Sequence, residues 1–133
     1  MNDLSLTTLD GGRTTISASA LEALAATLRG TLFYATDEGY QTARTVWNAM
    51  IDRRPGVIVR CMGAADVINA VRFARDHGLL LAVRGGGHNI AGNAVCDGGL
   101  MIDLSQMKSI RVDPIAQRAV VEPGATLGDV DRE

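Results

Sequence analysis

The hydrophobic pattern is clearest in the middle of the chain, where two short apolar runs flank an amphipathic stretch. Val57–Arg60 and Leu79–Val83 have the length of buried strands and are too short for helices. Between them, apolar residues recur three and four positions apart, which predicts a helix over residues 64–77. Gly78 follows as a left-handed stop. These elements predict a right-handed βαβ crossover with parallel strands.

After this unit the pattern changes to short strands separated by turns. Leu100–Leu104 is a further apolar run, whereas Ile90–Gly99 is rich in glycine and asparagine and is predicted to be irregular. Ile110–Asp113 and Arg118–Glu122 flank an Asp-Pro turn and predict an antiparallel hairpin. Thr126 is the expected N-cap of a final helix. The predicted fold class is therefore α+β, with a short βαβ unit followed by antiparallel strands.

The pattern before the βαβ unit is weaker. Residues 1–18 are polar and predicted to be irregular, with a turn at Asp10–Gly12. A helix is expected to begin at Ser19, because Ser19 and Glu22 fit a capping box, and to end near Gly30.

Residues 34–54 leave two structures open. Four residues have helical spacing, but an extended segment that anchors the tryptophan in the core also fits the pattern. The four residues are Ala43, Val46, Trp47 and Met50.

Length and composition are those of one globular domain with a core. The chain has 133 residues, of which 47% are hydrophobic and 21% charged, and a formal net charge of −2. This charge gives no electrostatic reason to expect nucleic acid or an anionic membrane as a partner. No apolar run has the length of a membrane span, and Met1–Ser5 lacks the features of a secretory signal. We therefore expect a cytoplasmic protein.

The cysteines and histidines do not predict a metal site. Cys61 and Cys96 lie far apart without metal-ligand spacing, so free thiols are expected. His77 and His88 are eleven positions apart, and no cysteine or carboxylate is arranged around them. For His77, at the end of the predicted helix, we expect a helix-terminal role.

The most informative stretch is Leu79–Asn89, in which an apolar strand is followed by Arg84, three glycines and His88. Three successive glycines leave the backbone free to adopt positive φ and allow a ligand to approach it closely. Successive N–H groups in such a turn form a nest that binds anions. The alternative is a glycine-rich surface loop without a ligand. Its position after a parallel strand favours the binding loop, because open α/β sheets hold ligands there.

Two common phosphate-binding motifs are excluded for this loop. A P-loop requires a lysine followed by serine or threonine after the glycines, and neither is present at that spacing. A Rossmann fingerprint opens a helix, whereas residues 88–92 lead into irregular sequence. A phosphate at this position is therefore expected to bind loop amides, with Arg84 as a candidate ligand.

Several blocks of sequence, in the right order, resemble a known family. The blocks are Val83–Asn89, Asp97–Leu104, Ile110–Asp113 and Val120–Asp129, and Arg54–Cys61 matches the strand that opens the family's flavin domain. They resemble the FAD-linked oxidases of the vanillyl-alcohol oxidase and p-cresol methylhydroxylase (PCMH) superfamily. Within it, they are most similar to the berberine-bridge-enzyme-like branch, which includes bacterial 6-hydroxy-D-nicotine oxidase.

The resemblance covers about residues 40–133 and implies the first portion of a PCMH-type FAD-binding domain, preceded by a helical and irregular segment over residues 1–39. It implies that backbone amides cradle the FAD pyrophosphate and that the ring of His88 is bonded to the flavin 8α-methyl group. A neutral imidazole is a competent nucleophile for such a bond. The residues implied to bind the cofactor are Arg84, Gly85, Gly86, Gly87, His88 and Asn89.

Other parts of the family pattern have no counterpart in this sequence. Cys96 does not match the downstream cysteine that tethers FAD a second time in some members. No catalytic base is assigned, because turn and strand-edge roles suffice for Asp103 and Asp113 at predicted strand ends. We expect a truncated chain whose unpaired strand edges favour self-association.

The predicted function is the FAD-binding portion of a flavin-dependent oxidoreductase that oxidises a small alcohol or amine. Two alternatives stay open at this point. One is a non-catalytic FAD-binding or interaction module, and the other is a member of the superfamily that binds FAD non-covalently, with His88 as a contact only.

Overall fold

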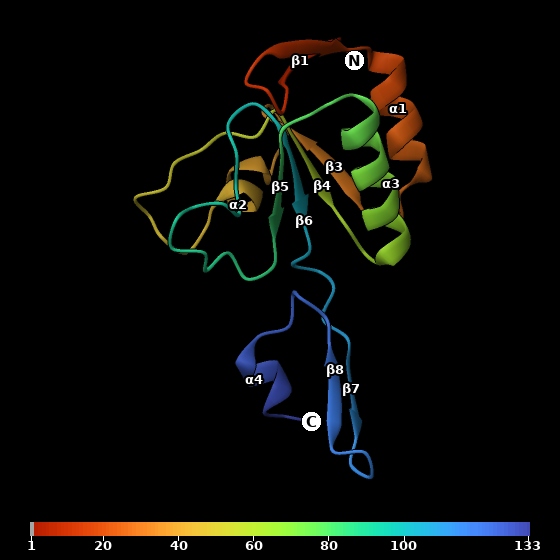
Figure 1. Ribbon diagram of the computed structural model, residues 1–133, viewed down its shortest axis with the longest axis vertical. Coiled ribbons are helices and arrows are strands. Elements are labelled where there is room, and N and C mark those ends of the chain that lie inside the picture. The colour runs from red at the N-terminus through yellow and green to blue at the C-terminus, as the bar shows by residue number, and fades with distance from the viewer. Residues whose placement is uncertain (1) are drawn as a thin grey trace.

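The computed structural model, which describes residues 2–133, has a four-stranded sheet at its centre (Figure 1). The strands lie in the order β3 (Thr31–Tyr34), β4 (Val57–Arg60), β6 (Leu100–Asp103) and β5 (Leu81–Arg84). β4, β6 and β5 are parallel, and β3 is antiparallel to β4. The carboxyl ends of three strands therefore meet at one edge of the sheet.

Helices cover both faces of this sheet. α1 (Ala18–Thr27) and α3 (Ala64–Asp76) lie against one face, and the short α2 (Tyr40–Arg44) lies against the other (Figure 1). Alternate residues of β4 and β6 point to opposite faces, as expected for strands. The first face buries Val57, Val59, Leu100 and Ile102, and the second buries Ile58 and Met101. All four positions of β6 are buried, because strands flank it on both sides and helices cover both faces of the sheet.

The predicted parallel βαβ unit is confirmed, with one difference. β4, α3 and β5 have the expected order and direction, but β6 lies between the two strands and hydrogen-bonds to both. α3 ends one residue earlier than predicted, with His77 as its C-cap and Gly78 at a φ of +61°. The helix-terminal role of His77 and the left-handed stop are therefore confirmed.

Asp66 attaches the N-terminus of α3 to the sheet. Its buried carboxylate accepts hydrogen bonds from the backbone N–H groups of Met62, Arg29 and Gly30, at 2.9, 2.9 and 3.0 Å. Burial raises the pKa of Asp66, but these hydrogen bonds outweigh it and hold the pKa below its ordinary value. The carboxylate therefore joins the start of α3 to the segment that leads into β3.

The N-terminal segment differs from the prediction. Residues 1–18 were expected to be irregular, but β1 (Leu4–Thr7) and β2 (Arg13–Ile16) form an antiparallel hairpin around the predicted turn. Leu6 and Ile16 are buried in the main core, whereas the neighbouring Ser5 and Thr15 are exposed. This two-residue alternation is a strand signal that the polar composition concealed.

The first helix is also shifted relative to the prediction. Ser17, not Ser19, caps α1, because the Ser17 side chain accepts a hydrogen bond from the Ala20 N–H at 3.2 Å. The helix ends at Thr27, before Gly30. β3 follows and pairs with β4, so residues before 40 contribute to the central sheet. The division of the chain at residue 39 stays a prediction.

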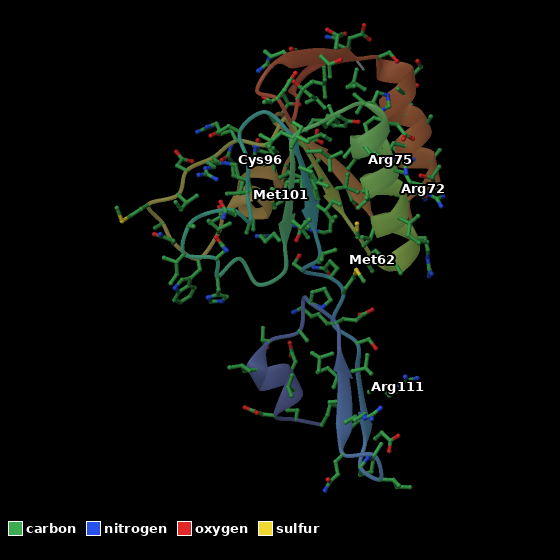
Figure 2. The ribbon with its side chains drawn as sticks, viewed as in Figure 1. Met62, Arg72, Arg75, Cys96, Met101 and Arg111 are labelled. Atoms are coloured by element: carbon green, nitrogen blue, oxygen red, sulfur yellow. The ribbon has the colours of Figure 1, made fainter. Side chains whose placement is uncertain are left out.

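The last three elements form a small unit that extends away from the sheet (Figure 1). β7 (Ile110–Asp113) and β8 (Arg118–Val121) form the predicted antiparallel hairpin, and Figure 2 shows Arg111 projecting from it, away from the helices. α4 (Leu127–Val130) begins at the predicted N-cap, where Thr126 and Asp129 form a capping box. Over residues 2–133, no helix combines the length and the apolar character that a membrane crossing requires.

Candidate functional site

The glycine-rich loop begins where β5 ends, at the edge where the carboxyl ends of the parallel strands meet. Gly85 lies so close to the C-terminal unit that an added Cβ would be 2.6 Å from the Pro123 carbonyl oxygen. Gly87 has a φ of +74°, which a residue with a side chain rarely adopts. The structure thus requires glycine at both positions, for two different reasons.

The backbone amides of this loop are free. None of the hydrogen bonds found within residues 2–133 is donated by the N–H groups of Gly85, Gly86, Gly87, His88 or Asn89. The loop is held instead through its carbonyl and side-chain oxygens, for example by the Trp47 N–H, which donates to the Gly87 carbonyl at 3.0 Å. Consecutive unpaired amides around a positive φ form the type of nest that binds anions.

A buried carboxylate contacts Arg84, the residue that precedes the glycines of the loop. Asp103, the last residue of β6, accepts hydrogen bonds from Arg60 Nε at 2.7 Å, Arg84 Nη2 at 2.8 Å and the Ser105 N–H at 3.0 Å. Burial raises the pKa of Asp103, but the hydrogen bonds from the two guanidinium groups outweigh it and keep the pKa below its ordinary value. The carboxylate is therefore charged and ties the ends of β4, β5 and β6 together.

Arg84 connects this carboxylate to the segment that follows α2. Its Nη1 donates to the Thr45 carbonyl at 2.7 Å. Its Nε is buried and donates to no group in the part of the chain that the structure describes. A buried guanidinium N–H without an acceptor is costly, and an anionic ligand at this position would satisfy it.

His88 and Trp47 face each other across the loop. Their ring centroids are 5.1 Å apart and their planes are inclined by 31°. Trp47 is 76% exposed, so the extended segment that anchors it in the core is wrong. A helix does form within residues 34–54, but it is too short to include Val46, Trp47 and Met50. α2 ends at Arg44, Val46 enters the core, and the next side chain points outward.

A mainly apolar cleft of about 690 Å³ lies between the loop and the C-terminal unit. Gly86 and His88 line one side, and the other side comes from the end of β8 and from the segment through α4. The residues on that side are Val121, Gly124, Ala125, Thr126, Leu127, Gly128 and Val130. A cleft of this size with polar groups at one wall is typical of a cofactor or ligand site.

The structure brings together most of the predicted site residues and adds others. Gly86 and His88 line the cleft, and Arg84 lies behind the loop, whereas Asn89 accepts a hydrogen bond from the Asn93 N–H at 3.0 Å. The sequence did not predict the pairing of Asp103 with two arginines or the contact of Trp47 with His88. The pairing of Asp103 had a usable signal, because it ends an apolar strand parallel to two others that each end in arginine.

The remaining candidate groups are not part of this site. Cys61 and Cys96 are buried free thiols, and burial raises their pKa to about 12 and about 11, which disfavours the reactive thiolate. Among residues 2–133, no cluster of three or more histidine, cysteine or carboxylate side chains has the arrangement of a metal site.

Comparison with known proteins decides the family. A model of the FAD-binding domain family matches residues 55–133, which include β4 to α4 and the whole loop. The chain belongs to the FAD-binding domain family. FAD contains a charged pyrophosphate and a large aromatic ring system. The free amides of the glycine loop and the unpaired Nε of Arg84 fit the first, and the apolar cleft fits the second.

The relatives include FAD-linked oxidoreductases. The chain is 40% identical over 106 residues to (R)-6-hydroxynicotine oxidase of Paenarthrobacter nicotinovorans, a match that covers 80% of this chain and 23% of the relative. It is 38% identical over 105 residues to an uncharacterised FAD-linked oxidoreductase of Bacillus subtilis, again covering 23% of the relative.

Solved structures agree with this family. The crystal structure of 6-hydroxy-D-nicotine oxidase from Arthrobacter nicotinovorans matches with a TM-score of 0.74 at 39% identity, over 79% of this chain and 23% of the other. A berberine-bridge-enzyme-like protein of Physcomitrella patens matches with a TM-score of 0.68 at 29% identity, over 76% of this chain and 22% of the other. The fold is thus the expected PCMH-type FAD-binding fold, and the chain spans about a quarter of the length of these relatives.

Proposed function

We propose that this chain supplies the FAD-binding portion of a flavin-dependent oxidoreductase that oxidises a small alcohol or amine, with the flavin tethered through His88. The observation that carries the proposal is the row of free amides from Gly85 to Asn89 beside an apolar cleft. Membership of the FAD-binding domain family supports FAD as the ligand. FAD supplies a two-electron acceptor for substrate oxidation, which the side chains of this site lack.

In this proposal the glycine loop binds the pyrophosphate. The N–H groups of Gly85, Gly86 and Gly87 donate to phosphate oxygens, and Arg84 adds a charge-assisted hydrogen bond from its unpaired Nε. Asp103 fixes the guanidinium plane of Arg84 through a 2.8 Å hydrogen bond. Asn89 completes the loop by accepting a hydrogen bond from Asn93, which orders the turn that follows.

The apolar part of the cleft suits the flavin ring. His88 is exposed and lines the cleft, so its ring nitrogens are open to the 8α position of a bound flavin. Val121, Leu127 and Val130 on the opposite wall would offer apolar contacts to the flavin ring system. The substrate and the catalytic base are assigned to no residue of this chain.

The decisive experiment is acid precipitation of the protein after incubation with FAD. Flavin absorbance in the washed pellet is expected for the wild-type chain and is expected to be lost in His88→Ala. His77→Gln is the matched control, because His77 caps α3 before β5 begins, whereas the glycine loop follows the end of β5, and this change is expected to leave retention unchanged. Retention that persists in His88→Ala would exclude the tether.

The same assay separates the alternatives. Flavin that binds the native protein but moves to the supernatant after precipitation indicates a non-covalent member of the superfamily. A chain that binds no FAD at micromolar concentration in either assay contradicts the proposed function and favours an interaction module.

A further inference from the structure

We propose that Trp47 is a positioning residue, whose indole ring fixes the imidazole of His88 at the mouth of the cleft before any ligand arrives. The proposal rests on the proposed function for the purpose of this arrangement, but the arrangement itself is a property of the free chain. The single tryptophan of the protein is 76% exposed. Tryptophan is usually highly buried, so this exposure needs a physical reason.

The backbone that leads into Trp47 is fixed by the residues that precede it. Tyr40 of α2 is buried, and its hydroxyl donates to the Pro55 carbonyl at 2.5 Å. Thr45 ends the helix in an extended conformation, and its hydroxyl donates to the Gln41 carbonyl at 2.7 Å. Val46, the next residue, is 6% exposed and packs in the second core cluster. The direction of the Trp47 side chain is therefore imposed by its neighbours.

The segment Thr45–Trp47 also grips the loop that carries His88. The Thr45 carbonyl accepts from Arg84 Nη1 at 2.7 Å, immediately before the glycines. The Trp47 N–H donates to the Gly87 carbonyl at 3.0 Å, immediately before His88. An added Cβ at Gly87 would lie 3.5 Å from the Val46 Cα, so the two backbones are in contact. The loop is thus clamped at both ends of its glycine run.

The indole ring packs against the one aromatic side chain of the loop. His88 is exposed, and no hydrogen bond to its ring nitrogens is found within residues 2–133. Its ring lies between Trp47 and the Gly86 backbone, where an added Cβ would be 3.1 Å from the His88 Cδ2. The ring centroids of Trp47 and His88 are 5.1 Å apart, within the range of favourable aromatic pairs. Such a pair changes the population of one orientation by about two- to tenfold.

The chain contains an internal reference for this pair. Its other histidine, His77, packs against Phe73 with ring centroids 4.3 Å apart and planes inclined by 35°. In addition, His77 Nδ1 lies 2.9 Å from the Phe73 carbonyl oxygen, so a hydrogen bond also orients this ring. With two histidines and one tryptophan, each ring gives a separate spectroscopic signal.

The test compares the carbon-bound ring protons of both histidines by NMR, in the FAD-free full chain. In the wild type, the His88 resonances are expected to show an upfield ring-current shift that is lost in Trp47→Ala and largely restored in Trp47→Phe. The His77 resonances are expected to stay unchanged in both variants. Ile90→Ala removes an apolar side chain that is 86% exposed and close to His88 in sequence, and it should leave the His88 signal in place.

A second measurement connects the pair to flavin retention. The initial rate at which acid-stable flavin accumulates is expected to fall about two- to tenfold in Trp47→Ala and to recover in Trp47→Phe. If the His88 resonances of Trp47→Ala are identical to those of the wild type, the inference is overturned, whatever the flavin result. Wild-type protein that retains no flavin would refute the proposed tether, and the NMR comparison would still decide whether Trp47 positions His88.

Discussion

β6 and β8 are both four-residue strands of this chain, yet their surroundings are opposite. Every residue of Leu100–Asp103 is buried, and every residue of Arg118–Val121 is exposed. β6 has a strand on each side and helices over both faces, whereas β8 pairs only with β7. The central sheet is therefore stabilised by its own core, and the C-terminal hairpin is not.

The difference separates residues that build the fold from residues available for a ligand. Exposed apolar residues of the C-terminal unit include Val120, Val121 and Leu127, two of which line the cleft. Figure 1 shows this unit attached below the sheet through the segments that follow β6 and β8. The two regions touch where Gly85 approaches the Pro123 carbonyl, at the edge of the candidate site.

The largest effect is expected for Asp103→Ala. This variant leaves Arg60 and Arg84 without their buried partner, which should cost about 3–5 kcal/mol of unfolding free energy. Asp113→Ala is the matched control, because Asp113 also ends a strand but is exposed and accepts only two turn N–H groups. Urea denaturation of both variants measures the contrast, and equal losses would show that the buried carboxylate is not special.

The pH dependence of the Asp103 contribution should also differ from that of a surface carboxylate. Its pKa is lower in the folded state than the ordinary value of about 3.9, so ionisation favours folding above that pH. The contribution is fully present at neutral pH and disappears as the pH falls through the folded pKa. The stability gap between the wild type and Asp103→Asn should therefore narrow as the pH falls below about 4 and through the folded pKa.

Thermal unfolding of the two proteins across that pH range measures the gap. Asp113→Asn, which keeps an acceptor for its turn amides, should show no comparable narrowing. A gap that stays constant down to acidic pH would mean that Asp103 is not a charged partner of the two arginines.

A smaller difference in unfolding free energy is expected when apolar side chains are shortened in the two regions. Ile102→Val removes one buried methylene from β6 and should cost about 0.5–1.5 kcal/mol. Val120→Ala removes more carbon from a side chain that is 59% exposed, yet it should change stability by no more than about 0.5 kcal/mol. The midpoints of urea denaturation compare the two variants, provided that the slope of unfolding free energy against urea is unchanged. A larger loss of stability for Val120→Ala would show that the hairpin has a core of its own, contrary to the structure.

The sequence was sufficient for the elements whose signals are local. The periodicity of α3, the stop at Gly78, the Asp-Pro turn of the hairpin and the N-cap at Thr126 all appear as predicted. Each depends on residues within a few positions of one another. The family resemblance is also visible in the sequence, because each of its motifs is a short continuous block.

Features that depend on distant segments were not predicted. β6 lies between β4 and β5, so its apolar residues Leu100, Met101 and Ile102 have a strand on each side, and the local sequence pattern does not contain that strand order. Trp47 was expected in a helix or in the core, but Val46 takes the buried position and directs the next side chain outward. Its role becomes visible only when the glycine loop, some forty residues later, is beside it.

The smallest effect on folding is expected for Leu127→Ala. This variant also tests most directly whether the exposed C-terminal unit, in contrast to the central sheet, serves the ligand. Leu127 is 82% exposed, so its loss should alter the stability of the FAD-free chain by no more than about 0.5 kcal/mol. Because Leu127 lines the cleft, the same change should weaken FAD binding. A ligand at 100 times its dissociation constant stabilises the folded state by about 2.7 kcal/mol, and the variant should gain visibly less at the same FAD concentration.

Ile115→Ala provides the control for this last test. Ile115 is 96% exposed at the tip of the hairpin and does not line the cleft, so its loss should leave both the free and the FAD-bound stability unchanged. Thermal shift measurements across an FAD titration compare the three proteins. An equal shift for Leu127→Ala and the wild type would mean that the exposed apolar side chains of the C-terminal unit do not contact the cofactor, and that the cleft is not its binding site.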